Sequence, residues 1–365
     1  MKTVILGAGI TGLTAGYDTE ATIYESDATP GGLCKSIKIN GCMVEESGGH
    51  WIFGMNSVID KVFKELQIEY STYKKITGVH FDTIIDGSIQ DFANRSIEYR
   101  PGTMKEYLFQ NFGRVLCNMF FSPFNKLYTN GLYERVQNEC AYKNSSSGPS
   151  YNNEFIYPDN GLKFLIDSLS ERINVKLDHQ AYKIDTDNKR VYFSNRESVS
   201  YDTLISTVPL SNLLYMIDEY EPLECVTTFV VNIYGDIGDR LPSHHWLYTP
   251  FGGYYRVGFY TNVSKKFAPK GQCMAYVETT KDTYTPEMIM KDLERHGFIK
   301  KPKLGSVKNI KCAYTYRKQG QNIENIIKKL KEKDIHSIGR YGKWKFQGIV
   351  ESMMDGLSAK KSLSL

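Results

Sequence analysis

Three glycines near the N-terminus have the spacing of a phosphate-binding turn. Gly7, Gly9 and Gly12 form a G-x-G-x-x-G pattern directly after a short apolar run, and Glu25 ends a second apolar run. Such a turn brings a pyrophosphate against the backbone at the start of a helix, while the acid accepts the hydroxyls of an adenosine ribose. A carboxylate at this position argues against a 2′-phosphate. The pattern predicts a dinucleotide site with a short crossover helix over residues 11–18.

Two glycine pairs follow the ribose acid closely. Gly31-Gly32 precedes Leu33, and Gly48-Gly49 precedes His50. Because glycine has no Cβ, the backbone at both pairs can lie against a flat ring system, which indicates a thicker ligand than NAD. The alternative is that both pairs are only turns, as we expect for Asn40-Gly41.

The C-terminal part of the chain supplies a second half of the predicted site. Residues 336–338 read as a strand that ends in Gly339-Arg340, and a helix is predicted over residues 349–361, after Gly348. The N-terminus of that helix would stabilise negative charge on a reduced flavin. In flavoproteins, the two ends of the chain commonly surround one cofactor, so the predicted ligand is FAD.

Longer motifs throughout the chain resemble one family. The chain is similar to the amine oxidase/protoporphyrinogen oxidase-like flavoproteins, and within them to the UDP-galactopyranose mutases, particularly the eukaryotic type. The matching runs are GAGITGL at 7–13, TPGGL at 29–33, GGHWIF at 48–53, FG at 112–113, FSPFNK at 121–126, WLYTP at 246–250, YR at 255–256, TNVS at 261–264 and GRYGKW at 339–344.

The resemblance implies a chemistry without net oxidation. In these mutases, N5 of reduced FAD attacks the anomeric carbon of a nucleotide-linked sugar and expels the diphosphate. The sugar then recloses through another hydroxyl, which interconverts pyranose and furanose. FAD is therefore expected in its reduced form, with NADH or NADPH as reductant, and the pathway is glycan precursor synthesis.

The resemblance also implies roles for individual residues. His50 would lie beside flavin N5 and Arg340 near the isoalloxazine carbonyls, as the catalytic pair. Arg256 would clamp the diphosphate, with Tyr248 on the same wall and Phe124 and Asn125 near the substrate cleft. The expected cofactor-binding residues are Gly7, Gly9, Gly12, Glu25, Gly31, Gly32, Leu33, Gly49, His50, Ala181, Gly339, Arg340, Gly348 and Ile349.

Three positions depart from the family pattern. The segment 141–146, which aligns with the second arginine of the diphosphate clamp, contains no arginine, and Lys143 is its nearest substitute. Two tyrosines of the substrate site align with Gln321 and Phe346, which we keep as substrate-site positions. The flavin half of the pattern is thus intact and the diphosphate half is eroded, which makes UDP-galactopyranose a poor expectation as the specific substrate.

Composition sets limits on the other functions. A net charge of +4 fits a small anionic ligand and gives no sign of nucleic acid. Seven cysteines without C-x-x-C read as reduced thiols of a cytoplasmic protein, and no cluster has metal-ligand spacing. No apolar run is long enough to span a membrane. Oligomeric state is left open.

The expected fold is α/β, or α+β overall, with three parts. A discontinuous Rossmann-like FAD-binding domain takes residues 1–55, 155–215 and 310–365. A mainly helical substrate domain takes 56–150, and an antiparallel or mixed sheet domain takes 216–309. Besides the mutase, two alternatives stay open: an FAD oxidoreductase of the amine oxidase or protoporphyrinogen oxidase type, and an FAD-binding protein without catalysis.

Overall fold

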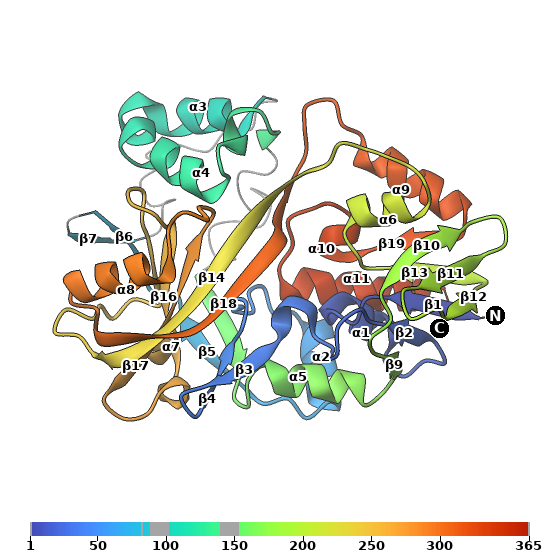
Figure 1. The fold of residues 1–365 in the computed structure, drawn as a ribbon, viewed down its shortest axis with the longest axis horizontal. Coiled ribbons are helices and arrows are strands. Elements are labelled where there is room, and N and C mark those ends of the chain that lie inside the picture. The colour runs from blue at the N-terminus through green and yellow to red at the C-terminus, as the bar shows by residue number, and fades with distance from the viewer. Residues whose placement is uncertain (1, 82, 88–101, 139–152, 364–365) are drawn as a thin grey trace.

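Two sheets of different character dominate the molecule (Figure 1). The computed structural model describes residues 2–81, 83–87, 102–138 and 153–363. A parallel sheet lies near both described chain ends, and a larger mixed sheet lies at the opposite end of the view. The long strands β14 (Glu224–Ile237) and β18 (Ile299–Tyr316) run diagonally between the two regions.

The parallel sheet has five strands in the order β19-β13-β1-β2-β9. Its central strands are short, apolar and completely buried, as expected where helices cover both faces of a parallel sheet. The strands come from three separate stretches of the chain: β1 (Thr3–Leu6), β2 (Thr22–Tyr24), β9 (Asn174–Lys176), β13 (Thr203–Ser206) and β19 (Ile335–Ser337). The predicted α/β fold with a Rossmann-like sheet is confirmed.

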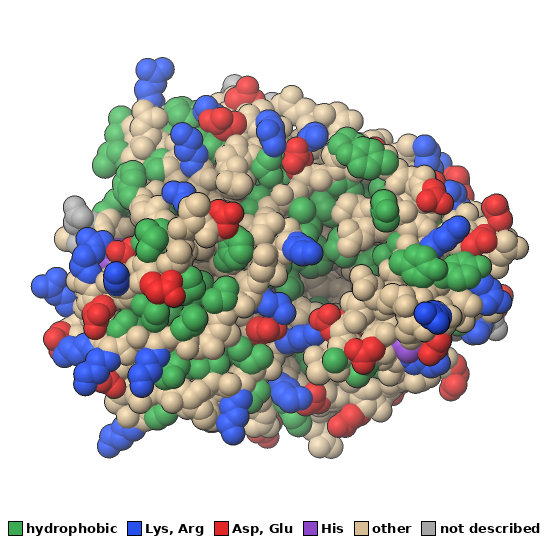
Figure 2. Space-filling model, viewed as in Figure 1, with side chains coloured by type: hydrophobic (Ala, Val, Ile, Leu, Met, Phe, Trp, Pro, Cys, Tyr) green, Lys and Arg blue, Asp and Glu red, His purple; other side chains and the backbone are tan. Residues whose placement is uncertain are grey.

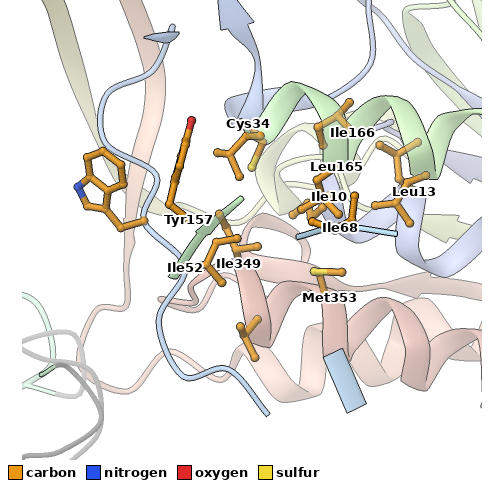
Figure 3. Close-up of a cluster of buried hydrophobic side chains, with 14 of the residues drawn as sticks. Ile10, Leu13, Cys34, Ile52, Ile68, Tyr157, Leu165, Ile166, Ile349 and Met353 are labelled. Atoms are coloured by element: carbon orange, nitrogen blue, oxygen red, sulfur yellow. The ribbon is translucent and has the colours of Figure 1, made fainter. Parts of the chain in front are cut away.

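Three helices build the core beside this sheet: α1 (Ile10–Gly16), α5 (Leu162–Ser170) and α11 (Ile349–Ser362). Figure 3 shows Ile10 and Leu13 of α1 close to side chains of α5 and α11. Gly356 permits a close approach, because a Cβ there would lie 2.6 Å from the Thr11 carbonyl oxygen. The first and last described helices are therefore packed directly together.

The mixed sheet has seven strands in the order β18-β14-β17-β16-β15-β6-β7. Its last two strands lie within residues 56–150, so that segment contributes to the sheet as well as supplying helices. β15 pairs with β6 in parallel, and the other neighbours are antiparallel. The remaining strands are β6 (Thr77–His80), β7 (Ile84–Asp86), β15 (Trp246–Tyr248), β16 (Arg256–Phe259) and β17 (Gln272–Thr279).

A helical layer from residues 103–134 lies beside the mixed sheet (Figure 1). It begins with a capping box, in which Thr103 and Glu106 satisfy each other's backbone N–H groups. Gly113 breaks the first helix with φ of 76°, and a π-helical turn follows. The elements are α3 (Met104–Leu116), η3 (Cys117–Phe121), α4 (Ser122–Tyr128) and η4 (Leu132–Glu134).

Smaller elements connect these layers. The predicted Asn40-Gly41 turn is confirmed: both residues have positive φ and join β3 (Ser36–Ile39) to β4 (Cys42–Glu45). The other strands are β5 (Tyr70–Lys74), β8 (Glu154–Pro158), β10 (Ala181–Asp185), β11 (Arg190–Phe193) and β12 (Ser198–Ser200). The other helices are η1 (Gly32–Cys34), α2 (Ser57–Glu65), α6 (Leu210–Met216), α7 (Tyr260–Val263), η8 (Lys265–Phe267), α8 (Pro286–Arg295), α9 (Ile323–Glu332) and α10 (Gly339–Gly342).

Candidate active site

The glycine turn between β1 and α1 has three different local requirements. Gly7 has φ of 96°, a conformation that side chains other than glycine rarely adopt. Gly12 is pressed against the turn, since a Cβ there would lie 2.0 Å from the Gly7 carbonyl oxygen. At Gly9 a Cβ would meet no heavy atom within 4 Å. The open side of this turn is therefore at Gly9, where the sequence predicts the pyrophosphate.

The Glu25 carboxylate is fixed beside this turn. It follows β2, is 7% exposed, and accepts hydrogen bonds from the backbone N–H groups of Ala8 at 2.6 Å and Asp27 at 2.9 Å. Backbone donors hold a carboxylate without neutralising it, so Glu25 retains acceptor capacity for further donors. The ribose role predicted for Glu25 is consistent with this arrangement and remains a prediction.

The first glycine pair packs onto the same turn. The Gly31 N–H donates to the Ala8 carbonyl oxygen at 2.8 Å, and a Cβ on Gly32 would lie 3.2 Å from the Gly9 Cα. Leu33 lies in the short helix η1 that follows. Ala181 begins β10, close after His179, whose N–H donates to the Glu25 carbonyl oxygen at 2.7 Å. All these predicted cofactor-binding residues therefore lie around the glycine turn or close to Glu25.

The second glycine pair packs against protein on the side where a Cβ would lie, and its contact with a flavin ring remains a prediction. A Cβ on Gly49 would lie 2.4 Å from the Tyr276 hydroxyl oxygen and 2.6 Å from Trp51 Nε1. Gly48 has φ of 88° and lies against Tyr276 and Glu278. Glycine is thus needed here for packing against a tyrosine ring of β17, whatever else the loop contacts.

The tautomer of His50 follows from its position in this loop. Its Nδ1 lies 3.0 Å from the Gly48 carbonyl oxygen, which can only accept a hydrogen bond, so Nδ1 carries the proton. Burial lowers the pKa of His50, whereas the Gly48 carbonyl and the Glu278 carboxylate raise it. The guanidinium groups of Arg340 and Arg256 also lower this pKa, and the net change is a decrease. The imidazole is therefore neutral at neutral pH, and its lone pair is on Nε2.

Arg340 is the second residue of the short helix α10, after β19, and backbone carbonyls and aromatic rings surround its guanidinium. Nη2 donates to the Ala313 carbonyl oxygen at 2.7 Å and Nη1 to the Gln347 carbonyl oxygen at 3.2 Å. Its Cζ lies 4.8 Å from the ring centroid of Phe346 and 5.2 Å from that of Tyr314. No carboxylate among the described residues forms an ion pair with Arg340, so its charge is not neutralised locally.

The residues around Arg340 form the rest of the C-terminal half of the predicted cofactor site. Gly339 has φ of 78° and faces the Thr11 side chain, which ties this turn to α1. The Gly348 N–H donates to the Glu351 carboxylate at 2.9 Å, and Ile349 is buried in the core beside α1. The predicted helix after Gly348 is present as α11.

Arg256 is held in a side-chain network on the mixed sheet. It lies directly opposite Glu278 in the β16–β17 register, and its Nη2 contacts the Glu278 carboxylate at 2.5 Å and the Tyr314 hydroxyl at 3.0 Å. The Tyr255 hydroxyl donates to the same carboxylate at 2.8 Å. The charge of Arg256 is thus largely balanced by Glu278, which is only 5% exposed.

Both arginines keep a buried donor without an acceptor. Among the described residues, the Nε–H groups of Arg256 and Arg340 have no hydrogen-bond partner. A buried donor left without a partner costs free energy, so an oxygen-rich anion that reaches these groups would gain binding energy. The space-filling view in Figure 2 shows a hollow near the middle of the face in view, with hydrophobic, basic and acidic side chains around it.

Aromatic side chains connect the helical layer to this charged cluster. Phe124 of α4 packs edge-to-face with Tyr248 of β15, at 5.5 Å between ring centroids. Tyr128 lies one helical turn further and contacts Tyr255 and Tyr314. Phe124 and Tyr248, two predicted substrate-site residues that are distant in the sequence, are thus in direct contact.

Three predicted positions lie elsewhere or are otherwise engaged. Gln321 donates to the Glu221 carboxylate at 2.9 Å in the loop after β18. Asn125 is 1% exposed and donates to the Phe121 carbonyl oxygen of its own helical layer. Lys143, with the rest of 141–146, lies outside the described residues. Substrate roles for these residues remain predictions without a supporting contact.

Comparisons with known proteins identify the fold. A family model for an NAD(P)-binding Rossmann-like domain matches residues 5–66. A solved structure of a reduced UDP-galactopyranose mutase matches with a TM-score of 0.86 and 24% identity, over 100% of this chain and 93% of that chain. The fold is that of UDP-galactopyranose mutase.

The UDP-galactopyranose mutase fold is shared more widely at lower similarity. An oxidoreductase from Methanosarcina mazei matches with a TM-score of 0.71 and 15% identity, over the full length of both chains at 100% each. A CLA-producing fatty acid isomerase from P. acnes has a TM-score of 0.70 and 13% identity, over 100% of this chain and 98% of that one. The fold therefore accommodates proteins with different activities.

Sequence reasoning missed Glu278 and Tyr314 at the centre of the charged cluster around Arg256, and it gave no role to Tyr255, which it named only as part of a matching run. One signal was available: Glu278 is a lone carboxylate directly after the apolar run 273–277. A charge inside an apolar strand usually has a buried partner. In the part of the chain that the structure describes, no helix is long and apolar enough to cross a membrane, and no three His, Cys, Asp or Glu side chains form a metal-type cluster.

Proposed function

We propose that this protein is a flavin-dependent mutase that interconverts pyranose and furanose forms of a nucleotide-linked sugar without net oxidation. The observation that carries the proposal is that Arg256 and Arg340 both contact Tyr314, at 3.0 Å from its hydroxyl and 5.2 Å from its ring centroid, and that each keeps a buried Nε–H without a partner among the described residues. A diphosphate is a ligand whose oxygens suit two guanidinium groups. The mutase fold over the full chain supports the same choice.

The residues of the glycine turn fit FAD as the cofactor. The open side at Gly9 has room for a pyrophosphate, and Glu25 has acceptor capacity for ribose hydroxyls. Gly31 and Gly32 border this turn, and Arg340 would lie near the flavin carbonyls. When bound in its reduced form, FAD supplies a nucleophilic nitrogen for the anomeric carbon of the sugar. NADH or NADPH is the proposed reductant.

His50 would control a proton at the edge of the flavin. Because Nδ1–H is engaged with the Gly48 carbonyl oxygen, Nε2 can accept a hydrogen bond and take up a proton. Burial lowers the pKa of His50 despite the opposing effects of the Gly48 carbonyl and Glu278, so the imidazole returns the proton readily. His50 would thereby accept a hydrogen bond from a donor at the flavin edge before the reaction, and its imidazole would not stay protonated.

The two arginines would bind the diphosphate unequally. Arg340 has no carboxylate partner among the described residues and offers a full positive charge, while Glu278 offsets the charge of Arg256 and fixes its position. The diphosphate would therefore be attracted mainly by Arg340 and oriented by Arg256. The aromatic wall of Phe124 and Tyr248 would cover the sugar and exclude water.

Counting turnovers per electron pair tests the proposal. The enzyme is reduced with dithionite without oxygen, mixed with a panel of UDP- and GDP-hexopyranoses, and the furanose products are separated by chromatography. We expect many turnovers for each electron pair. Strict one-to-one consumption of reductant, or no isomerised product from any sugar nucleotide, contradicts the mutase assignment.

Substitution of His50 tests its place in the mechanism. His50→Ala should retain FAD, measured by flavin absorbance, and lose most turnover. His296→Ala provides a matched control, because His296 caps the C-terminus of α8, whose buried side chains pack in a different hydrophobic cluster from the one that contains Tyr276. Full activity of His50→Ala would remove the proton role, and loss of FAD would assign His50 to cofactor binding only.

An FAD oxidoreductase is the second candidate function. The eroded diphosphate pattern favours it, since Gln321 is engaged with Glu221 and Phe346 stacks on Tyr314 in place of a family tyrosine. Similarity to an oxidoreductase of the same fold is consistent with this reading. For either function we propose a cytoplasmic enzyme, with a role in glycan precursor synthesis if the mutase assignment holds.

A further inference from the structure

A lysine side chain lies beside the glycine turn. Residues 3–34, which contain the turn and Glu25, have no lysine or arginine, and Lys35 is the first cation after them. The Lys35 side chain packs against Gly31, since its Cγ lies 3.2 Å from the position of a Cβ on that glycine. The Gly31 N–H donates to the Ala8 carbonyl oxygen of the turn at 2.8 Å. Lys35 is thus a basic side chain next to the predicted pyrophosphate position.

The charged end of Lys35 reaches the ribose side of the same site. Its Nζ lies 2.5 Å from Oδ2 of Asp27. The Asp27 N–H in turn donates to the Glu25 carboxylate at 2.9 Å. The lysine therefore extends from the first glycine pair to the loop that holds the predicted ribose acceptor.

The two members of this ion pair differ in exposure. The Lys35 side chain is 13% exposed, whereas the Asp27 side chain is 56% exposed. Water can solvate the Asp27 carboxylate once the pair separates, so the separation costs little free energy on that side. A largely buried ammonium group without an anion would cost more, so Lys35 needs a negative partner wherever its Nζ lies.

We propose that Lys35 binds the pyrophosphate of the cofactor, and that Asp27 holds the lysine ammonium group in place until the cofactor arrives. The inference rests on the proposed function, which assigns FAD to the glycine turn. A pyrophosphate carries two negative charges, and residues 7–13 offer it backbone N–H groups but no side-chain cation. The lysine ammonium has three donors on a flexible stem, so it can turn from the carboxylate to a phosphate oxygen.

The alternative role for Lys35 is to neutralise Asp27 and thereby hold the loop beside Glu25. The two roles predict opposite responses to Asp27→Asn. If Asp27 competes with the pyrophosphate for the lysine, the substitution frees Lys35, and FAD should bind several-fold more tightly. If the ion pair only holds the loop, the same substitution should weaken FAD binding. The asparagine keeps the backbone N–H that donates to Glu25, so the ribose acceptor is unchanged.

Titration of the flavin-free protein, with its folding checked by circular dichroism, measures cofactor affinity. FAD binding is followed by fluorescence, and binding of ADP, which also has an adenosine ribose and two linked phosphates, by calorimetry. Lys35→Met should weaken both by about tenfold, because one charge-assisted contact is lost, and Lys35→Arg should recover most of the affinity. Added KCl should reduce the FAD affinity of wild type more steeply than that of Lys35→Met, since salt screens the attraction.

Lys38→Met is the matched control. Lys38 is an exposed lysine of the neighbouring strand β3, so the variant should bind FAD as wild type does. The double variant Lys35→Met/Asp27→Asn separates the two roles of the lysine, and it should bind FAD more weakly than Asp27→Asn alone. Equal FAD affinity of these two variants would show that Lys35 acts only on Asp27, which overturns the proposal.

These measurements need no turnover, so their outcome is separate from that of the mutase assay. Binding of FAD and ADP by Lys35→Met at wild-type affinity overturns the role of Lys35 and leaves the cofactor assignment in place. A wild-type protein that binds FAD but isomerises no sugar nucleotide contradicts the mutase assignment alone. A wild-type protein that binds neither FAD nor ADP overturns both proposals.

Discussion

At the parallel sheet, the glycine turn is shaped by backbone: Gly7 has positive φ, Gly12 touches the Gly7 carbonyl, and Gly9 faces open space. At the mixed sheet, side chains hold the charges, with Arg256 fixed by Glu278 and Tyr314. The first arrangement depends on a few neighbouring residues. The second depends on the register of three strands, so a change there has consequences at several distant positions.

The largest expected effect is at Gly12, where the backbone arrangement is most crowded. Gly12→Ala places a Cβ 2.0 Å from the Gly7 carbonyl oxygen, so the turn must distort. We expect no measurable FAD binding and a lower melting temperature. Flavin absorbance after reconstitution and thermal unfolding measure the two effects.

Gly9→Ala is the matched control. Its Cβ meets no heavy atom within 4 Å, so the melting temperature should equal that of wild type while FAD affinity falls. Unchanged FAD affinity in Gly9→Ala would show that the pyrophosphate does not lie at this glycine.

Arg256 is the corresponding test on the mixed sheet. Arg256→Ala leaves the buried Glu278 carboxylate without a cation, which should lower the free energy of unfolding by roughly 3–5 kcal/mol. Nucleotide-sugar affinity should fall about 10- to 100-fold with the loss of a charge-assisted contact. Urea unfolding and calorimetry measure these changes, with the exposed Arg295→Ala as control.

A double variant separates the two roles of Arg256. Arg256→Ala combined with Glu278→Gln removes the unpaired charge, so it should recover much of the stability and none of the affinity. Recovery of affinity in the double variant would show that Arg256 acts only by neutralising Glu278.

Glu45 extends the comparison to a buried carboxylate with no cation. It is 1% exposed, and its donors are the hydroxyls of Tyr157 and Ser36 and a backbone N–H. Burial raises the pKa of Glu45 from 4.5 to about 7. The folded state therefore binds this proton more tightly than the unfolded state does. Its stabilisation is complete below pH 4.5 and is lost as the pH rises through 7.

The expected change for Glu45 is on the order of 3 kcal/mol in the free energy of unfolding across this pH window. Glu45→Gln should flatten the pH dependence measured by urea unfolding. Glu46→Gln is the control and should leave this pH dependence in place. Glu46 is the neighbouring carboxylate, but it has a cation partner, Lys308, at 2.9 Å. An unchanged slope in Glu45→Gln would mean that Glu45 is ionised in the folded protein.

Gln321 should give the smallest effect. Its contacts lie in the loop after β18, with Glu221 and the Lys318 backbone. Gln321→Ala should change stability by about 0.5 kcal/mol and nucleotide-sugar affinity by about twofold at most. A loss of affinity comparable to that of Arg256→Ala would restore the substrate role predicted from the sequence.

The parts of the fold that the sequence predicts well have local causes. Asn40-Gly41 has the backbone preference of a tight hairpin turn, and the helix expected at 349–361 is observed as Ile349–Ser362. The glycine turn before Glu25 combines short-range spacing with apolar runs. In each case, neighbouring residues contain all the required information.

The parts that the sequence does not predict depend on pairing between distant segments. Arg256 faces Glu278 only because β16 and β17 pair in one register. Gly48-Gly49 packs on Tyr276 of β17, which no local pattern reveals. Likewise, β6 and β7 join the mixed sheet because β6 pairs with β15, although the helical periodicity of their neighbours dominates residues 56–150.

The strand order of the parallel sheet determines when the proposed cofactor site is completed during synthesis. The ribosome makes β1 first, yet β1 pairs with β13, β13 pairs with β19, and α1 packs on α11 near the end of the chain. The glycine turn and α1 therefore lack their packing partner α11 while most of the chain is translated. Binding of the proposed FAD would therefore follow the synthesis of α11, and until then the first strand and helix of the nascent chain must avoid aggregation.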